Sequence, residues 1–104
     1  MTPSTHPILD LDRLIHEPAR LAILTVLSAA EEVEFLFLQK VTGLSKGNLS
    51  VHAQKLEAAG HLETLKSFRG RIPLTTFRIT DEGRIALNRY HRQLRALLPE
   101  EGKP

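Results

Sequence analysis

One segment, TGLSKGNLSVHAQKLEAAG from Thr42 to Gly60, constrains the fold more than any other part of the chain. Gly43 can adopt the left-handed backbone conformation that a tight turn requires. Ser45 is a good helix N-cap because its hydroxyl accepts a hydrogen bond from a free backbone N–H group. The segment therefore predicts a helix over residues 45–59, joined to a preceding helix by a tight glycine turn and ended by Gly60.

The outward side of this helix carries small or mildly polar side chains, and within the helix no acidic residue precedes Glu57. Small side chains let a helix approach base edges in a major groove about 12 Å wide, and Asn, Gln, Ser and Lys can hydrogen-bond bases or phosphates. The residue types at 45–48 are also those of an ordinary helix cap and first turn. That alternative does not explain the presence of Ser50, Val51 and Gln54 farther along the helix. The packed side is expected to hold Leu49, His52, Ala53 and Leu56. The residues expected to contact DNA are Ser45, Lys46, Gly47, Asn48, Ser50, Val51, Gln54 and Lys55.

The rest of the chain predicts further helices and one hairpin. Residues 8–16 predict a short helix, and Pro18 suits the first position of the next one. Residues 35–42 predict a helix with Phe35, Leu38 and Val41 on one side, preceded by a brief strand at Val33. Strands around 62–68 and 77–79 flank a loop at 69–73 that contains Gly and Pro. Thr80 can cap the last helix, whose first turn is acidic.

The order helix, helix, tight turn, helix, hairpin, helix is that of a winged helix-turn-helix. The predicted fold class is therefore mainly α with a small β-hairpin (α+β). Because 104 residues suffice for one core but not for two, we expect a single domain over residues 8–98. Residues 1–7 and 99–104 are expected to form flexible tails.

Charge is distributed unevenly along the chain. Residues 1–39 hold two basic and six acidic residues, a net charge of −4, whereas residues 40–104 hold twelve basic and six acidic residues, a net charge of +6. Between positions 66 and 78 the chain carries four cations and no acid, namely Lys66, Arg69, Arg71 and Arg78. A basic face on a chain of modest net charge indicates a polyanionic partner. A solvated hairpin that happens to be basic is the alternative for this segment taken alone.

Three segments together resemble the winged-helix domain of MarR/ArsR-type transcriptional regulators, in the compact form without a separate ligand domain. They are HEPARLAIL at 16–24, VTGLSKGNLSVHAQKLEAAGHL at 41–62 and FRITDEGRIAL at 77–87. The resemblance implies a homodimeric regulator, which we expect to be a repressor, bound to an inverted repeat in double-stranded DNA. It places the helix at 45–59 in the major groove and the wing at 66–78 on the backbone or in the minor groove. Arg69 and Arg71 match the wing tip, and together with Lys66 they are expected to contact DNA.

Apolar residues near both ends of the chain suggest a dimer interface. They would form a patch too large for a monomer to expose, so we expect a twofold interface. The expected interface residues are Ile8, Leu9, Leu11, Leu14, Tyr90, Leu94, Leu97 and Leu98. Arg84, Arg92 and Arg95 share another side of the last helix, where they are either solvated or placed to meet phosphate or acidic residues of the partner.

Several other functions are not expected. The chain has no cysteine, unlike ArsR-type metal sensors, and its five histidines lack metal-ligand spacing. A serine nucleophile (Ser45 or Ser50) with His52 as its base is also conceivable from the sequence. No third residue to orient the histidine and no oxyanion site accompany them, as a hydrolase would need. We therefore expect no enzyme, no metal and no cofactor, and a cytoplasmic protein without a membrane span. A small-molecule effector stays open. The remaining alternative is a winged helix that binds proteins instead of DNA.

Overall fold

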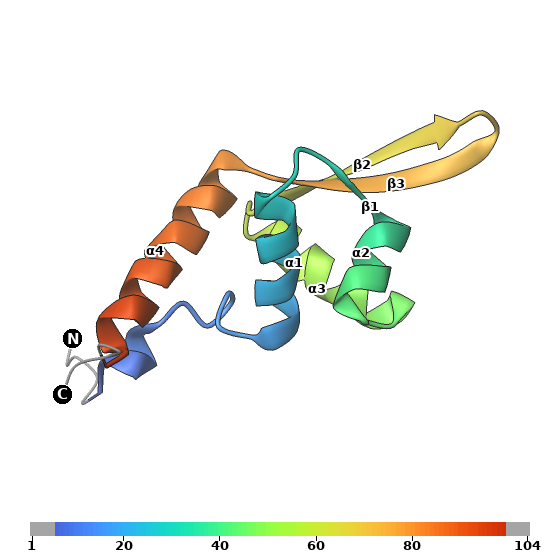
Figure 1. Cartoon of the computed structure of the whole chain (residues 1–104). Helices are drawn as coiled ribbons and strands as arrows, with labels where there is room; N and C mark the ends of the chain where they lie inside the picture. Colours follow the sequence, from blue (N-terminus) through green and yellow to red (C-terminus); the bar gives the residue numbers. More distant parts are fainter. Residues whose placement is uncertain (1–5, 100–104) are drawn as a thin grey trace.

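The computed structural model describes residues 6–99, and its architecture is the predicted winged helix-turn-helix (Figure 1). In chain order the elements are η1 (a 3-10 helix, Pro7–Asp10), α1 (Pro18–Ser28), β1 (Val33–Glu34), α2 (Phe35–Thr42), α3 (Lys46–Ala58), β2 (Leu62–Arg69), β3 (Ile72–Ile79) and α4 (Asp81–Leu97). Helices α1, α2 and α3 lie beneath the β2–β3 hairpin, and the tip of the hairpin projects beyond them. Helix α4, at the left of Figure 1, lies on the other side of α1 from α2. The tails expected at 1–7 and 99–104 lie largely outside the described residues.

The helix-turn-helix follows the local signals in the sequence. Gly43 has φ 73°, the left-handed conformation, and its N–H donates to the carbonyl of Gln39 at 2.9 Å. The Ser45 hydroxyl accepts from the N–H of Asn48 at 3.1 Å, as an N-cap does. Gly60, with φ 81°, follows the end of α3. The predicted helix at 45–59 is confirmed, with its first and last residues acting as caps.

Two predictions about the first half of the chain are wrong in detail. Residues 8–16 form no α-helix; beyond η1 they continue as turns, because the carboxylate of Asp12 accepts from the N–H groups of Leu14 and Ile15 at 2.9 and 3.3 Å and so competes with helical bonds. In α2, Val41 is exposed, not packed. Phe35 of the same helix packs as expected, since its ring lies 5.9 Å from the Phe77 ring, centroid to centroid.

The sheet has the antiparallel strand order β1-β3-β2. Its register pairs Val33 with Phe77, as the brief strand at Val33 required, and Arg69 with Ile72 at the tip. The turn is only Gly70 and Arg71, so the loop predicted at 69–73 is too long. Pro73 lies inside β3 although proline has no N–H group to donate to a neighbouring strand. It is tolerated there because β1 pairs only with residues 76 and 77, so that β3 has β2 as its single neighbour at position 73.

The core lies between α1, the buried sides of α2 and α3, and the base of the hairpin. Its side chains include Ile23, Leu24, Leu27, Leu38, Leu49, Leu56, Leu62 and Phe77. Helix α4 contributes Leu87 and Tyr90, whereas its Ile85 side chain is exposed.

The start of α4 presses directly on the connection between α3 and β2. Thr80 caps α4 as predicted, since its hydroxyl accepts from the N–H of Gly83 at 2.9 Å. The same hydroxyl donates to the carbonyl of Gly60, and the N–H of Thr80 donates to the carbonyl of His61 at 3.1 Å. A Cβ atom on Gly83 would lie only 2.1 Å from that His61 carbonyl oxygen. The absence of a side chain at position 83 therefore permits this packing.

Candidate nucleic-acid interface

Helix α3 presents different residues to the core, to the hairpin and to solvent. Leu49, Ala53 and Leu56 are buried. The opposite, outer side, defined here as Gly47, Val51, Gln54 and Ala58, is exposed. Of the residues expected to contact DNA on this helix, all are exposed except Ser50, which is half-buried on the side facing the hairpin. The small, uncharged outer side is therefore accessible along the length of the helix.

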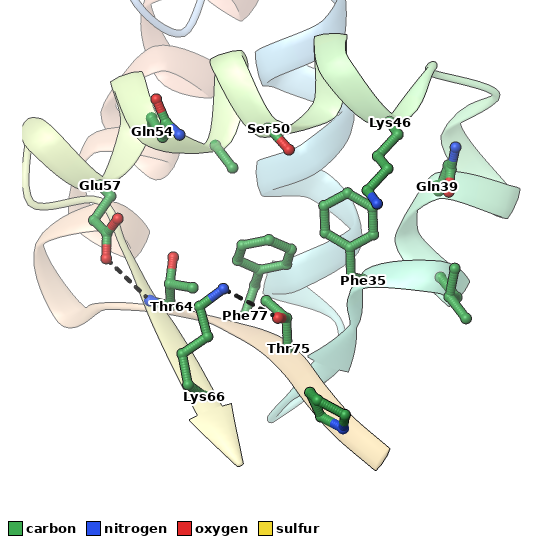
Figure 2. A pocket seen from close by; sticks show the side chains of 13 residues that line it. Phe35, Gln39, Lys46, Ser50, Gln54, Glu57, Thr64, Lys66, Thr75 and Phe77 are labelled. Atoms are coloured by element: carbon green, nitrogen blue, oxygen red, sulfur yellow. Dashed lines mark hydrogen bonds between the residues drawn. The ribbon is translucent and has the colours of Figure 1, made fainter. Parts of the chain in front are cut away.

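A groove of about 570 Å³ separates α3 from the hairpin and from α2 (Figure 2). On the α3 wall stand Lys46, Ser50 and Gln54, and on the hairpin wall Thr64, Lys66 and Thr75. The aromatic rings of Phe35 and Phe77 lie between these walls. Lysines and neutral hydrogen-bonding groups thus face each other across an opening with an apolar floor.

One acidic side chain at this groove was not anticipated. Glu57 lies at one end, where its carboxylate accepts from the backbone N–H of Thr64 at 3.3 Å (Figure 2). This bond ties the last turn of α3 to the beginning of β2. The helical spacing from Ser50, seven residues earlier, could have placed Glu57 on this side.

The basic residues of the hairpin are not equivalent. The guanidinium of Arg69 pairs with Glu34 of β1, and that of Arg78 pairs with Glu63 at 2.5 Å. The hydrogen bond to Glu63 raises the pKa of Arg78 above its usual range. Within residues 6–99 no salt bridge involves Lys66 or Arg71. These two cations can therefore meet an anion without breaking an ion pair inside the chain.

A polar cluster joins α3 to the start of α1. As expected, His52 lies on the packed side of α3, where its Nδ1 is 3.0 Å from a guanidinium nitrogen of Arg20 and 3.6 Å from the carboxylate of Glu17. Burial acts to raise the pKa of Glu17, but the N–H groups of Arg20 and Ala19 and the nearby charges outweigh it and hold this pKa below its usual value. The stabilisation from Glu17 is therefore lost as pH falls through that lowered pKa.

The residues expected at a dimer interface fall into two groups. Leu11 and Tyr90 are only 4% and 2% exposed, because they pack inside their own subunit, where the Tyr90 hydroxyl lies 2.7 Å from Nδ1 of His16. They cannot form a surface for a partner in this conformation. Ile8, Leu9 and Leu98 are exposed, and Leu14, Leu94 and Leu97 are half-buried. The interface itself stays a prediction.

Other kinds of site find no support in the described part of the chain. Between residues 6 and 99 no three His, Asp or Glu side chains are grouped so that they could hold a metal ion. No helix in the same range has the length and apolar character needed to cross a bilayer.

Comparisons with known proteins agree with this geometry. Residues 19–98 match the family described as Winged helix DNA-binding domain. An uncharacterized protein of Methanocaldococcus jannaschii is 38% identical over 79 residues, which cover 75% of this chain and 85% of that protein. The transcriptional regulator homologue protein from Pyrococcus horikoshii OT3 has 31% identity and a TM-score of 0.82, covering 88% of this chain and 92% of its own.

The expected likeness to MarR- and ArsR-type regulators is also confirmed. A MarR family transcriptional regulator from Silicibacter pomeroyi has a TM-score of 0.65 at 22% identity, covering 80% of this chain and 55% of that chain. A solved ArsR family regulator shares the fold as well. At this level of identity the likeness concerns the fold alone.

Proposed function

Because the chain belongs to the winged helix DNA-binding domain family, we propose that it is a sequence-specific, double-stranded-DNA-binding regulator of transcription that acts as a homodimer. One observation carries this proposal. The outer side of α3 is exposed, small and free of acid, and it adjoins a groove whose two walls each carry a lysine.

The proposed binding mode follows from the position of the groove beside α3 and from the chemistry of its walls. The outer side of α3 enters the major groove of DNA, where Gln54 and Val51 meet base edges. One sugar–phosphate strand then runs along the groove between α3 and the hairpin. Lys46 approaches this strand from one wall and Lys66 from the other, while Arg71 meets phosphate beyond them.

We propose a twofold dimer built from the exposed apolar residues at the chain ends, namely Ile8, Leu9 and Leu98, with the half-buried Leu14, Leu94 and Leu97 beside them. A twofold axis would set the two α3 helices about 34 Å apart, one turn of DNA, and would require an inverted repeat in the operator. Repression is the simplest result, since a dimer that covers a promoter blocks it without touching the polymerase.

The dependence of affinity on salt tests DNA binding. If Lys46, Lys66 and Arg71 of each subunit meet phosphate, a dimer contacts about six phosphates, and a plot of log affinity against log salt has a slope of about −5. Selection of bound duplexes from a random pool is expected to recover an inverted repeat. A shallow slope together with no recovered sequence would exclude the proposal and favour a protein-binding role.

Glu57 is expected to weaken DNA binding, because its carboxylate faces the path proposed for the phosphates. Glu57→Gln keeps an acceptor for the Thr64 N–H and removes the charge. We expect affinity for all duplexes to rise by about fivefold for a dimer at low salt. The matched control is Glu31→Gln, which makes the same charge change in the exposed turn between α1 and β1. Equal effects of the two substitutions would show that Glu57 is remote from DNA.

A further inference from the structure

The tip of the hairpin exposes two large apolar side chains among cations. Phe68 is 71% exposed and Ile72 is 69% exposed, and between them the chain runs Arg69, Gly70, Arg71. No acidic residue occurs from position 64 to position 80. The positive charge around these side chains indicates that the partner of this tip is an anion.

The register of the hairpin assigns these two side chains to opposite faces. Thr64 pairs with Phe77, Lys66 with Thr75 and Phe68 with Pro73, and because paired residues share a face, Phe68 continues the row that lines the groove. Ile72 pairs with Arg69 and lies on the other face. Phe68 therefore points to the same side of the hairpin as the Lys66 side chain, two residues or about 7 Å farther from the core.

The place of Phe68 on the hairpin indicates which part of a DNA duplex it would meet if the duplex docks on α3. With the backbone of one strand in the groove, residues beyond Lys66 on the same face lie past that strand, over the adjacent minor groove. A hairpin that ends in a two-residue turn is slender there, and the minor groove is about 6 Å wide. Arg71 in this turn and Arg69 beside it carry the positive charge that suits the negative potential of a narrow minor groove.

We propose, on the basis of the DNA binding proposed above and with the wing tip in the minor groove, that Phe68 wedges between two neighbouring base pairs. Apolar side chains inserted in this way partly unstack one step and bend the duplex toward the major groove. Pyrimidine–purine steps open most easily, so the operator is expected to carry a TA or CA/TG step where the tip lies. The wing thereby adds sequence preference without hydrogen-bonding a base.

The test uses the operator recovered by selection, labelled at both ends for energy transfer and carrying 2-aminopurine at the step beneath the wing. The unaltered protein is expected to bend this duplex by 20° or more and to raise the 2-aminopurine fluorescence. Phe68→Ala should abolish both signals, remove the preference for a flexible step, and weaken operator binding by about tenfold. Phe68→Leu, which keeps an apolar wedge, should retain part of the bend.

Ile72→Ala is the matched control, because it removes a similarly exposed apolar side chain from the opposite face of the same tip. It should leave the bend and the fluorescence unchanged. Straight DNA in the complex with the unaltered protein, or a bend that survives Phe68→Ala, would overturn the wedge while leaving DNA binding intact. Failure to recover any operator, together with a shallow salt slope, would instead overturn the proposed function on which the wedge rests.

Discussion

Replacing Gly83 by alanine is expected to lower the free energy of unfolding by about 1–3 kcal/mol. The new methyl group would lie 2.1 Å from the His61 carbonyl oxygen, which already accepts from the N–H of Thr80. The obstacle is backbone and not a flexible side chain, so α4 must move away from the α3–β2 connection. Urea unfolding at one fixed protein concentration measures the change, since dimerisation would otherwise contribute.

Gly47→Ala provides the matched control, because Gly47 is also a helical glycine. A Cβ atom there meets nothing within 4 Å. Alanine favours the helix by up to about 1 kcal/mol over glycine, so this substitution should stabilise the protein or leave its stability unchanged. If both substitutions shifted the unfolding midpoint in the same direction, the close packing at Gly83 would not be limiting.

Replacing Ser50 and Gln54 together by alanine is expected to reduce the preference for the operator over random duplex by about 10- to 100-fold. Both side chains project from α3 toward the groove and its outer edge. Neither carries charge or packs in the core, so the fold and the affinity for random duplex should persist. Competition binding of the selected operator against random DNA measures the ratio of the two affinities.

Arg69→Ala combined with Arg71→Ala should give the opposite pattern. These side chains at the wing tip are proposed to act mainly through charge, so affinity for operator and random duplex should fall by similar factors, and the salt slope should become shallower. The Arg69 effect is expected to be the smaller one, because its guanidinium must first leave Glu34. If this pair relaxed sequence preference more than the Ser50 and Gln54 pair, the proposed roles of helix and wing would be reversed.

The parts of the fold that could be predicted are those specified by neighbouring residues. The glycine bend at Gly43, the caps Ser45 and Thr80 and the start of α1 at Pro18 each depend on side-chain chemistry within a few positions. The helix at 8–16 was wrongly predicted because apolar spacing took precedence over Asp12, whose carboxylate holds the backbone in a turn.

Contacts between distant segments could not be predicted in the same way. The pairing of Arg69 with Glu34 joins residues 35 positions apart, and nothing near either one indicates it. Similarly, the close approach of Gly83 to His61 depends on how α4 meets the α3–β2 connection. The burial of Tyr90 had a partial signal, since a tyrosine on an apolar helix side often packs within its own domain.

The contact between Gly83 and His61 also restricts motion. Because the first turn of α4 packs directly on the segment that follows α3, we expect a shift of one helix to be passed to the other. In the proposed dimer, Leu94, Leu97 and Leu98 at the end of α4 belong to the twofold interface, so a shift of α4 at that interface would also move α3. The distance between the half-sites would then be controlled from the far side of the molecule, by a contact that never meets a nucleotide.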